Sequence, residues 1–118
     1  MALDVNHAKT PGSPDLETFD LGSPLATMGP FIHPMLRRRL GEIAKENNIT
    51  LQSAVAPRYT DNIGLARDGV PSVLLELPLK YMHTSVETFD MHALTARARL
   101  LTAYCAAIDD SWRDELWN

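Results

Sequence analysis

The sequence has a single cysteine, Cys105, among 118 residues. One cysteine excludes a disulfide within the chain, and such a composition is typical of proteins that stay in a reducing compartment. No apolar run reaches the roughly 18 residues that a membrane-spanning helix needs. The first residues, Met1 to Asp4, lack the basic start and apolar middle of a signal peptide. We therefore expect a cytoplasmic protein that does not contact a membrane.

Positive charge is also scarce. The chain has 11 lysines and arginines against 15 acids, a formal net charge of −4. Its one basic run, Arg37–Arg39, lies in an amphipathic helix pattern and is expected on a solvated helix face. Nucleic-acid binding therefore has little electrostatic support. Cys105 lies in the apolar stripe of the last predicted helix, so we expect it to be a small buried hydrophobic residue.

The short motifs of several enzyme classes are missing. There is no glycine-rich phosphate loop of the form GxGxxG or GxxxxGKS/T, no GxSxG nucleophile elbow, and no HExxH motif or cysteine pair for zinc. Dinucleotide binding, P-loop phosphoryl transfer and serine-hydrolase chemistry consequently have no local support. The remaining candidates for chemistry are acids and histidines.

The hydrophobic pattern predicts one domain in which strands and helices alternate. Alternating or continuous apolar residues predict strands at 1–5, 49–56 and 70–77. Spacings of three and four residues predict helices at 34–47, 60–68 and about 88–108. Pro78 is expected to stop the third strand. We expect an α/β fold, a three-layer sandwich in which a central mixed or parallel sheet carries helices on both faces.

Two predicted elements have a defined apolar side. In the strand 49–56 one side is formed by Ile49, Leu51, Ser53 and Val55. In the last helix one stripe is formed by Leu94, Ala98, Leu101, Cys105 and Ile108. We expect both sides to face the core.

Two segments fall outside the pattern. Residues 9–30 are rich in proline and glycine and predict a long irregular loop, which in a compact domain is usually functional or mobile. The tail 109–118 carries Trp112 and Trp117 among acids. We expect this tail to dock on a partner or to extend the last helix.

Candidate functional residues follow each of the predicted strands. Asp4 ends the first, Asp61 follows the second and His83 follows the third. Open α/β sheets bind their ligands outside the carboxyl ends of the strands. An imidazole there can bind a metal ion or transfer protons. A catalytic zinc needs three protein ligands, and the residue pattern does not show a third.

Each candidate also has a structural interpretation. Asp61, directly after Thr60, is typical of a helix cap or a first-turn acid. Glu87 is expected to be a solvated or capping acid, or to orient His83 by a hydrogen bond. Ordinary surface or loop positions are expected for His7, His33 and His92.

Two segments, at residues 2–12 and 49–61, are similar to segments of a known enzyme family. Ala2–Val5 (ALDV), followed by Thr10–Gly12 (TPG), resembles the "a-hydrophobic-D-V…t-P-G" segment of the tetrahedral dinuclear-metal aminopeptidases of clan MH. Ile49–Gln52 (ITLQ), leading to Thr60–Asp61, resembles their "I-p-y-Q…G-G-T-D". The family includes glutamyl and deblocking aminopeptidases, the frv-operon protein and members once described as endoglucanases.

Two later segments complete the resemblance in the same order. Gly69–Ser72 (GVPS) resembles the family's four-residue segment "G-V/I-P-S/T". Pro78–Thr84 (PLKYMHT), with Glu87, resembles its "P-x-R-Y-M-H-S/T…E", and this is the most specific of the four pieces. The chain departs from the pattern at Arg58, Tyr59, Lys80 and Ser85, where the family has two glycines, an arginine and a proline.

The resemblance implies a role for each matching residue. By position, Asp4 would be a carboxylate ligand of one divalent metal ion and His83 the imidazole ligand of the other. The ions, zinc or cobalt, would polarise the scissile carbonyl and activate a water molecule. Asp61, Thr60 and Glu87 would support the site from behind the ligands or serve the fold alone.

The resemblance also implies what this chain lacks. The family's other metal ligands and its general-base glutamate precede the segment that matches here. We therefore expect the C-terminal segment of an aminopeptidase catalytic domain, residues 1–118, which binds metal weakly and is inactive alone. The parent would hydrolyse N-terminal residues from peptides and form a homo-oligomer. The alternative is a non-catalytic α/β module that self-associates through an exposed sheet edge.

Overall fold

The computed structural model describes residues 1–13, 18–55 and 60–117. Its strands are β1 (Ala2–His7), β2 (Leu25–Met28), β3 (Gln52–Val55) and β4 (Leu74–Leu79). Its helices are α1 (Pro34–Glu46), α2 (Asp61–Arg67), α3 (Met91–Ala107) and α4 (Ser111–Leu116). Among the described helices, none is both long and apolar enough to cross a bilayer.

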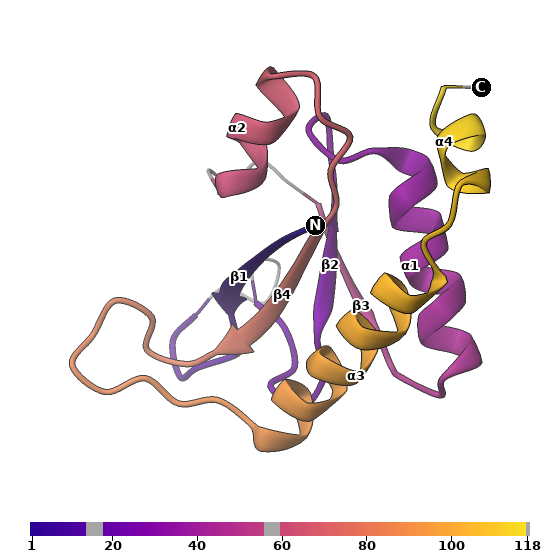
Figure 1. Cartoon of the computed structure of the whole chain (residues 1–118). Helices are drawn as coiled ribbons and strands as arrows, with labels where there is room; N and C mark the ends of the chain where they lie inside the picture. Colours follow the sequence, from indigo (N-terminus) through magenta and orange to yellow (C-terminus); the bar gives the residue numbers. More distant parts are fainter. Residues whose placement is uncertain (14–17, 56–59, 118) are drawn as a thin grey trace.

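The strands form one mixed sheet in the order β1-β4-β2-β3 (Figure 1). β1 pairs with β4 in parallel, β2 pairs with β3 in parallel, and β2 runs antiparallel to β4. The predicted α/β class with a mixed central sheet is therefore confirmed. The two parallel pairs point in opposite directions. The C-terminal ends of β1 and β4 therefore lie at one end of the sheet, and those of β2 and β3 lie at the opposite end.

β4 is the central strand, and all six of its residues are buried. The continuous apolar run predicted a strand covered on both faces, and this prediction is confirmed. Pro78, however, does not stop the strand, because it lies inside β4 opposite Asn6. β4 pairs with β2 only through Leu75 and Glu76, so no residue of β2 lacks a donor because of the proline at position 78.

The segment 9–30 was predicted to be a loop, but it contains the strand β2. Leu25 and Ala26 are completely buried and pair with both β3 and β4. Four residues are too few for a clear alternating pattern, so the strand was missed. The segment is also tied to β3 by Gln52, whose amide nitrogen donates to the carbonyl oxygens of Asp20 and Ser23 at 2.8 Å.

β3 is shorter than predicted and its exposed side is the opposite one. Ala54 is buried, whereas Val55 is 78% exposed. Ile49 is buried too, but it lies before the strand. The prediction of the apolar side was wrong because β3 begins only at Gln52, so the backbone before it does not continue the alternation. Ala56 lies outside the described residues.

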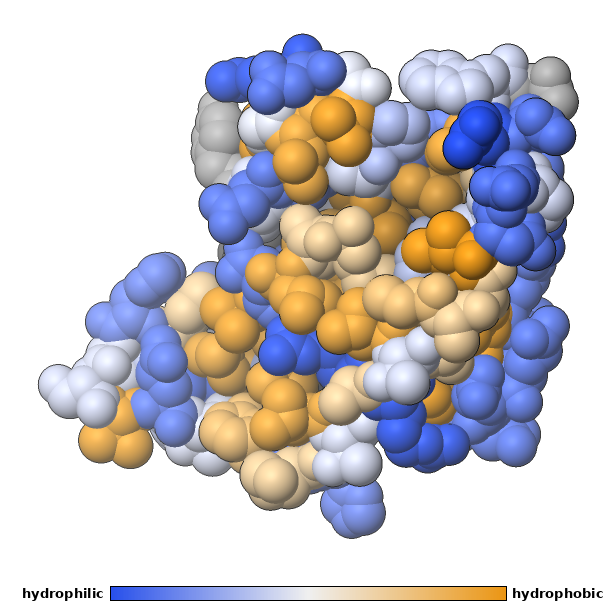
Figure 2. Space-filling view, viewed as in Figure 1, coloured by the Kyte–Doolittle hydropathy of each residue, from blue (hydrophilic) through white to orange (hydrophobic). Residues whose placement is uncertain are grey.

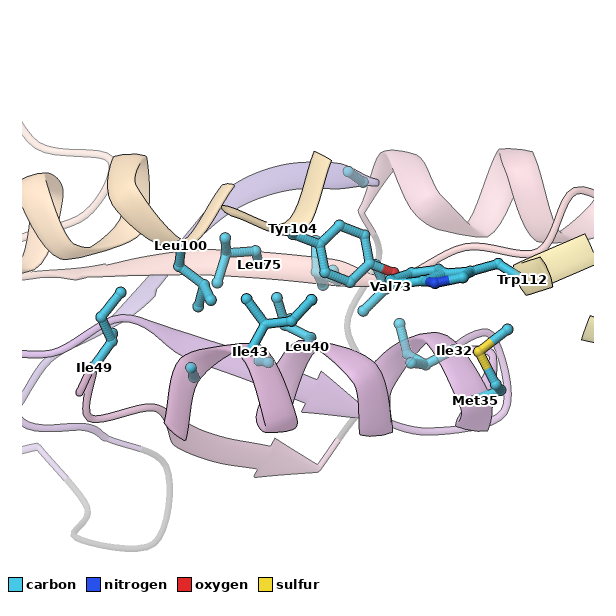
Figure 3. Close-up of a cluster of buried hydrophobic side chains, with 14 residues drawn as sticks. Ile32, Met35, Leu40, Ile43, Ile49, Val73, Leu75, Leu100, Tyr104 and Trp112 are labelled. Carbon is cyan, nitrogen blue, oxygen red and sulfur yellow. The ribbon is translucent and has the colours of Figure 1, made fainter. Parts of the chain in front are cut away.

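The main core lies between the sheet, α1 and α3. Leu40 and Ile43 from α1, Leu100 and Tyr104 from α3, and Leu75 from β4 point toward one another (Figure 3). The helices α1 and α3 thus contact each other on the same face of the sheet. Leu74, on the other face of β4, is buried as well.

α3 buries a different stripe from the one predicted. Ala93, Leu100 and Tyr104 are buried, whereas Ala98 and Cys105 are exposed. The prediction that Cys105 is buried is therefore wrong. α3 is apolar on two adjoining sides, and periodicity alone could not identify the side that faces the sheet.

The tail folds back onto its own chain as α4. Trp112 is buried and packs edge-on against Tyr104, with ring centroids 5.2 Å apart. The Arg39 guanidinium lies 5.6 Å from the Trp112 ring and also pairs with Glu115. Arg37 is not simply solvated either, since it donates to the Ser53 hydroxyl at 2.8 Å. The side chain of Arg38 is 63% exposed, as predicted for a solvated helix face, whereas Arg37 and Arg39 are half-buried. The tail forms a separate helix, so the prediction that it extends α3 was wrong, and its docking on a partner stays a prediction.

Tyr104 makes the stability of the fold sensitive to alkaline pH. Burial raises the pKa of the Tyr104 phenol far above its ordinary value of 10.0. The unfolded chain ionises this phenol above about pH 10 while the folded chain does not, so stability present below pH 10 is lost as the pH rises. We expect Tyr104→Phe to lack this loss. The difference in unfolding free energy between wild type and variant should shift by about 1.4 kcal/mol between pH 9 and 11.

Denaturant unfolding followed by circular dichroism at several pH values measures this difference. Tyr81→Phe, at a half-exposed tyrosine, is the matched control, and because it retains Tyr104 it should retain the wild-type loss. Parallel stability curves for wild type and Tyr104→Phe would contradict the expectation.

Candidate metal and peptide site

The candidate site lies where β1 and β4 end side by side. The two strands are parallel neighbours, and their last residues, His7 and Leu79, are paired in register. The segments that follow β1 and β4 therefore leave the sheet at the same end. Open α/β sheets bind their ligands at the C-terminal ends of their strands.

Asp4 lies within β1, three positions before its end. The sequence pattern indicated that Asp4 comes at the end of the strand, and the structure places it inside the strand instead. Its Oδ1 accepts a hydrogen bond from the backbone N–H of Val5 at 2.8 Å, and its carbonyl oxygen accepts one from Arg97 at 3.0 Å. The carboxylate is half-buried. These contacts hold the backbone at Asp4.

Glu76 lies directly across from Asp4 on β4, and the sequence analysis did not single it out. Its side chain is fully buried. One oxygen accepts from the Thr27 hydroxyl of β2 at 2.5 Å and the other from the Asn6 amide of β1 at 3.2 Å. Glu76 thus connects three strands next to Asp4. The signal was present, since an acid inside an otherwise apolar strand must have partners.

His83 lies in a loop that extends from the end of β4 (Figure 1). The base of the loop is closed by Lys80 and Thr88, whose backbones exchange hydrogen bonds at 2.8 and 3.1 Å. Inside it, the backbone N–H of His83 donates to the Glu87 carboxylate at 2.8 Å. The His83 ring itself is exposed. Glu87 therefore positions the backbone that carries His83.

Two residues of this loop have an unusual backbone conformation. Tyr81 and His83 have φ angles of 60° and 63°, in the left-handed region that side chains other than glycine rarely adopt. Such conformations cost of order 1–3 kcal/mol and concentrate at active sites and ligand clamps. The hydrogen bonds from Thr84 to the Tyr81 carbonyl and from His83 to Glu87 support this conformation.

A pocket of about 300 Å³ opens at the same edge of the sheet. It is formed by the ends of β1 and β4 and by the segments that follow them. Its walls carry both polar and apolar side chains. The pocket is lined by His7, Ala8, Thr10, Ser13, Thr18, Leu79, Tyr81 and Met82.

Thr60 and Asp61 lie at the other end of the sheet. Asn62, the next residue, donates to the Phe31 carbonyl, which also accepts from Ser72 just before β4 begins. His83 follows the opposite end of this six-residue strand, a distance of roughly 20 Å along it. The antiparallel step between β2 and β4 separates the two, so the structure does not bring Asp61 to His83. Its place as the first residue of α2 favours the structural interpretation. Arg58 and Tyr59 lie outside the described residues.

The other histidines occupy separate positions. His7 is the last residue of β1 and lines the pocket. His33 precedes α1, and its Nε2 is 3.1 Å from the Leu116 carbonyl oxygen of α4. His92 lies in the first turn of α3 and is exposed.

The described residues do not hold a complete metal site. Nowhere in the described ranges do three His, Cys, Asp or Glu side chains form a group that could hold an ion. Asp4 and His83 carry a carboxylate and an imidazole, side chains of the kinds that bind zinc or cobalt, but in the predicted two-metal arrangement they would supply only one ligand per ion. A full coordination shell would need ligands from elsewhere.

The hydrogen bond between Glu87 and His83 can be tested by substitution. We expect Glu87→Ala to loosen the His83 backbone, because the backbone N–H of His83 loses the carboxylate that accepts its hydrogen bond. Amide hydrogen exchange at His83 should then become about fivefold faster, as for the loss of roughly 1 kcal/mol. Glu87→Gln retains an acceptor oxygen and is the matched control, with exchange close to that of wild type. Equal exchange rates in all three proteins would show that this contact does not hold the loop.

Known proteins match this chain over nearly all of its length. The model of the M42 glutamyl aminopeptidase family matches residues 1–100. A lysyl aminopeptidase from Pyrococcus furiosus is 34% identical over 108 residues, which cover 87% of this chain and 31% of that protein. The chain thus spans about a third of the length of this relative.

Solved structures have the same fold. A TET aminopeptidase from a marine sediment archaeon of the Thaumarchaeota matches with a TM-score of 0.84 at 21% identity, over 97% of this chain and 34% of that one. The PhTET1-12s structure, a dodecamer, matches with a TM-score of 0.75 at 24% identity, over 90% of this chain and 33% of that one. At these identities the likeness shows the fold alone.

The four-part resemblance at residues 2–12, 49–61, 69–72 and 78–87 is thereby confirmed at the level of the family. The family match covers both β1 with Asp4 and the loop with His83. This chain belongs to the M42 glutamyl aminopeptidase family.

Proposed function

We propose that this chain supplies part of the active site of a metal-dependent aminopeptidase, which removes N-terminal residues from peptides. Asp4 would bind one divalent ion and His83 the other. The single observation that carries the proposal is the parallel pairing of β1, which contains Asp4, with β4, whose C-terminal end leads into the loop of His83. The family match agrees with this reaction class.

The two ions, when bound, would supply Lewis-acid polarisation of the scissile carbonyl. The residues of this chain contribute binding and orientation. Glu76 and Asn6 hold the strands around Asp4, and the closed loop holds His83. The polar and apolar walls of the pocket would take the first residue of the peptide.

The same geometry explains why the chain should be inactive alone. Asp4 and His83 provide one ligand per ion, so neither ion gains a chelate. By the resemblance, the general-base glutamate lies outside the segment that matches here. We propose that the missing ligands and base belong to the two-thirds of an M42 enzyme that this chain does not match. Homo-oligomer formation by the whole protein is proposed by analogy with the dodecameric structural neighbour.

Cobalt provides a direct test, because it is paramagnetic and broadens the NMR signals of nearby residues even when it binds weakly. We expect amide signals around Asp4 and His83 to broaden together as Co²⁺ is added, without saturation at one equivalent. Asp4→Asn and His83→Gln should each remove the joint broadening. His92→Gln, at an exposed histidine in α3, is the matched control and should leave it unchanged.

Two results would contradict the proposal. Broadening centred on His92 or on His33, with none at Asp4, would show that the two proposed ligands do not share a metal site. Tight stoichiometric binding by the isolated chain in calorimetry would show that the ligand set is already complete.

A further inference from the structure

A separate pocket lies at the end of the sheet opposite to His83. Its volume is about 360 Å³, within the range of small-molecule sites. β2 runs antiparallel to β4, so Met28, the last residue of β2, lies at the other end of the sheet from the loop that follows β4. The end of β2, the turn after it and the first turns of α1 form the walls. The pocket is lined by Met28, Gly29, Ile32, Pro34, Arg37 and Arg38.

Most of the surface of this pocket is apolar. Met28 lies on the same face of the sheet as Ala26, since side chains alternate along a strand. Ala26 is completely buried in the core, whereas Met28 is 44% exposed. Ile32 and Pro34 extend the apolar surface toward α1. An apolar group that binds here is removed from water, and this favours its binding.

Arg37 brings a positive charge to this apolar surface. Its side chain is half-buried, and burial lowers the pKa of the guanidinium below its ordinary value. Its Nη2 donates to the Ser53 hydroxyl of β3 at 2.8 Å, and its Nε is buried without an acceptor among the described residues. No ion pair within the described part of the chain includes Arg37. A partly buried cation without an acid costs free energy, which a bound anion would offset.

The two neighbouring arginines differ from Arg37, because acids already pair with them. Arg38 lies 3.7 Å from both Glu42 and Glu115. Arg39 pairs with the same two acids. Figure 2 shows mainly hydrophilic side chains at the right of the view, along the outer side of α1. Of the three arginines in this run, Arg37 is therefore the one whose charge no described acid balances.

We propose that this pocket binds a small carboxylate that carries an apolar group, such as a short-chain fatty acid. The carboxylate accepts charge-assisted hydrogen bonds from the Arg37 guanidinium. The apolar group lies against Met28, Ile32 and Pro34. The pocket also adjoins the positive end of α1, whose first turn contains no acid, and this favours an anion further. The site is separate from the proposed peptidase site and does not depend on it.

The residues that line the pocket distinguish this ligand from two others. A free amino acid, the product of the proposed peptidase reaction, carries an ammonium group. No acid among the described residues lines the pocket to pair with that group. Inorganic phosphate has no apolar part, so it would leave the apolar surface in contact with water. A carboxylate with an apolar group matches both parts of the pocket.

Hexanoate is the probe, and the measurement is an NMR titration of the 118-residue chain. We expect the amide signals of Met28 and Gly29 to shift with saturation, at a Kd of the order of 1 mM. Arg37→Met keeps a long apolar side chain without the charge and should weaken binding about tenfold or more. Arg67→Met, the same change at an exposed arginine in α2, is the matched control. Circular dichroism checks that each variant folds.

A second ligand and a conservative variant test the role of the charge. Hexanamide has the same length without the charge, so it should bind about tenfold more weakly than hexanoate. Arg37→Lys keeps the positive charge and loses the planar fork, so its affinity for hexanoate should fall between those of wild type and Arg37→Met. The comparison with hexanamide uses the wild-type chain and stays decisive if Arg37→Met does not fold.

Each outcome decides the proposal. Saturable binding of hexanoate that Arg67→Met retains and Arg37→Met loses supports it. Shifts that rise linearly without saturation in the wild-type chain overturn it, as does binding that Arg37→Met leaves unchanged. Equal binding of hexanamide and hexanoate would show that the carboxylate is not recognised. Larger saturating shifts of the same amides with inorganic phosphate would assign the pocket to a compact anion instead.

Discussion

The complete burial of β4 is the constraint on which the rest of the structure depends. A strand covered on both faces and paired on both edges cannot place an acid among its apolar residues without partners. Glu76 meets this condition through Thr27 and Asn6, which belong to the two neighbouring strands. The hydrogen bonds that satisfy one buried carboxylate therefore also join β1, β4 and β2. Because Asp4 lies next to Glu76, the packing of the sheet determines the surroundings of a proposed metal ligand.

The loop after β4 shows how such a sheet can present a histidine. Two left-handed residues turn the backbone sharply, and the Lys80–Thr88 pair closes the loop below them. Strain of this kind persists only where surrounding contacts support it. Glu87 supplies one such contact through the backbone, while the ring of His83 remains exposed. The acid that spacing placed near His83 thus acts on the conformation of the chain and not on the imidazole.

α3 and β1 each have apolar residues on a buried side and on an exposed side. Arg97 of α3 joins the two elements through the Asp4 carbonyl. The exposed side of α3 misled the prediction of burial. A periodic pattern of apolar residues predicts that one side of a helix is buried, but it does not predict which element packs against that side. In this chain Ala98, Cys105 and Ile108 of the predicted stripe are exposed, Leu101 packs only partly buried against the core, and α3 buries Leu100 and Tyr104 instead.

The sequence by itself determined the α/β class, the buried central strand, the short helix that begins near Asp61, and the family, because these follow from local periodicity and from short motifs in order. It also identified Asp4 and His83 as the residues to examine. Only the tertiary structure decided that β2 lies inside the presumed loop, and that its antiparallel step to β4 sends Asp61 away from His83. Glu76 and the open side of α3 likewise emerged only in three dimensions. The physical reason is that strand direction, burial and partner choice arise from contacts between residues far apart in the chain, which no local pattern records.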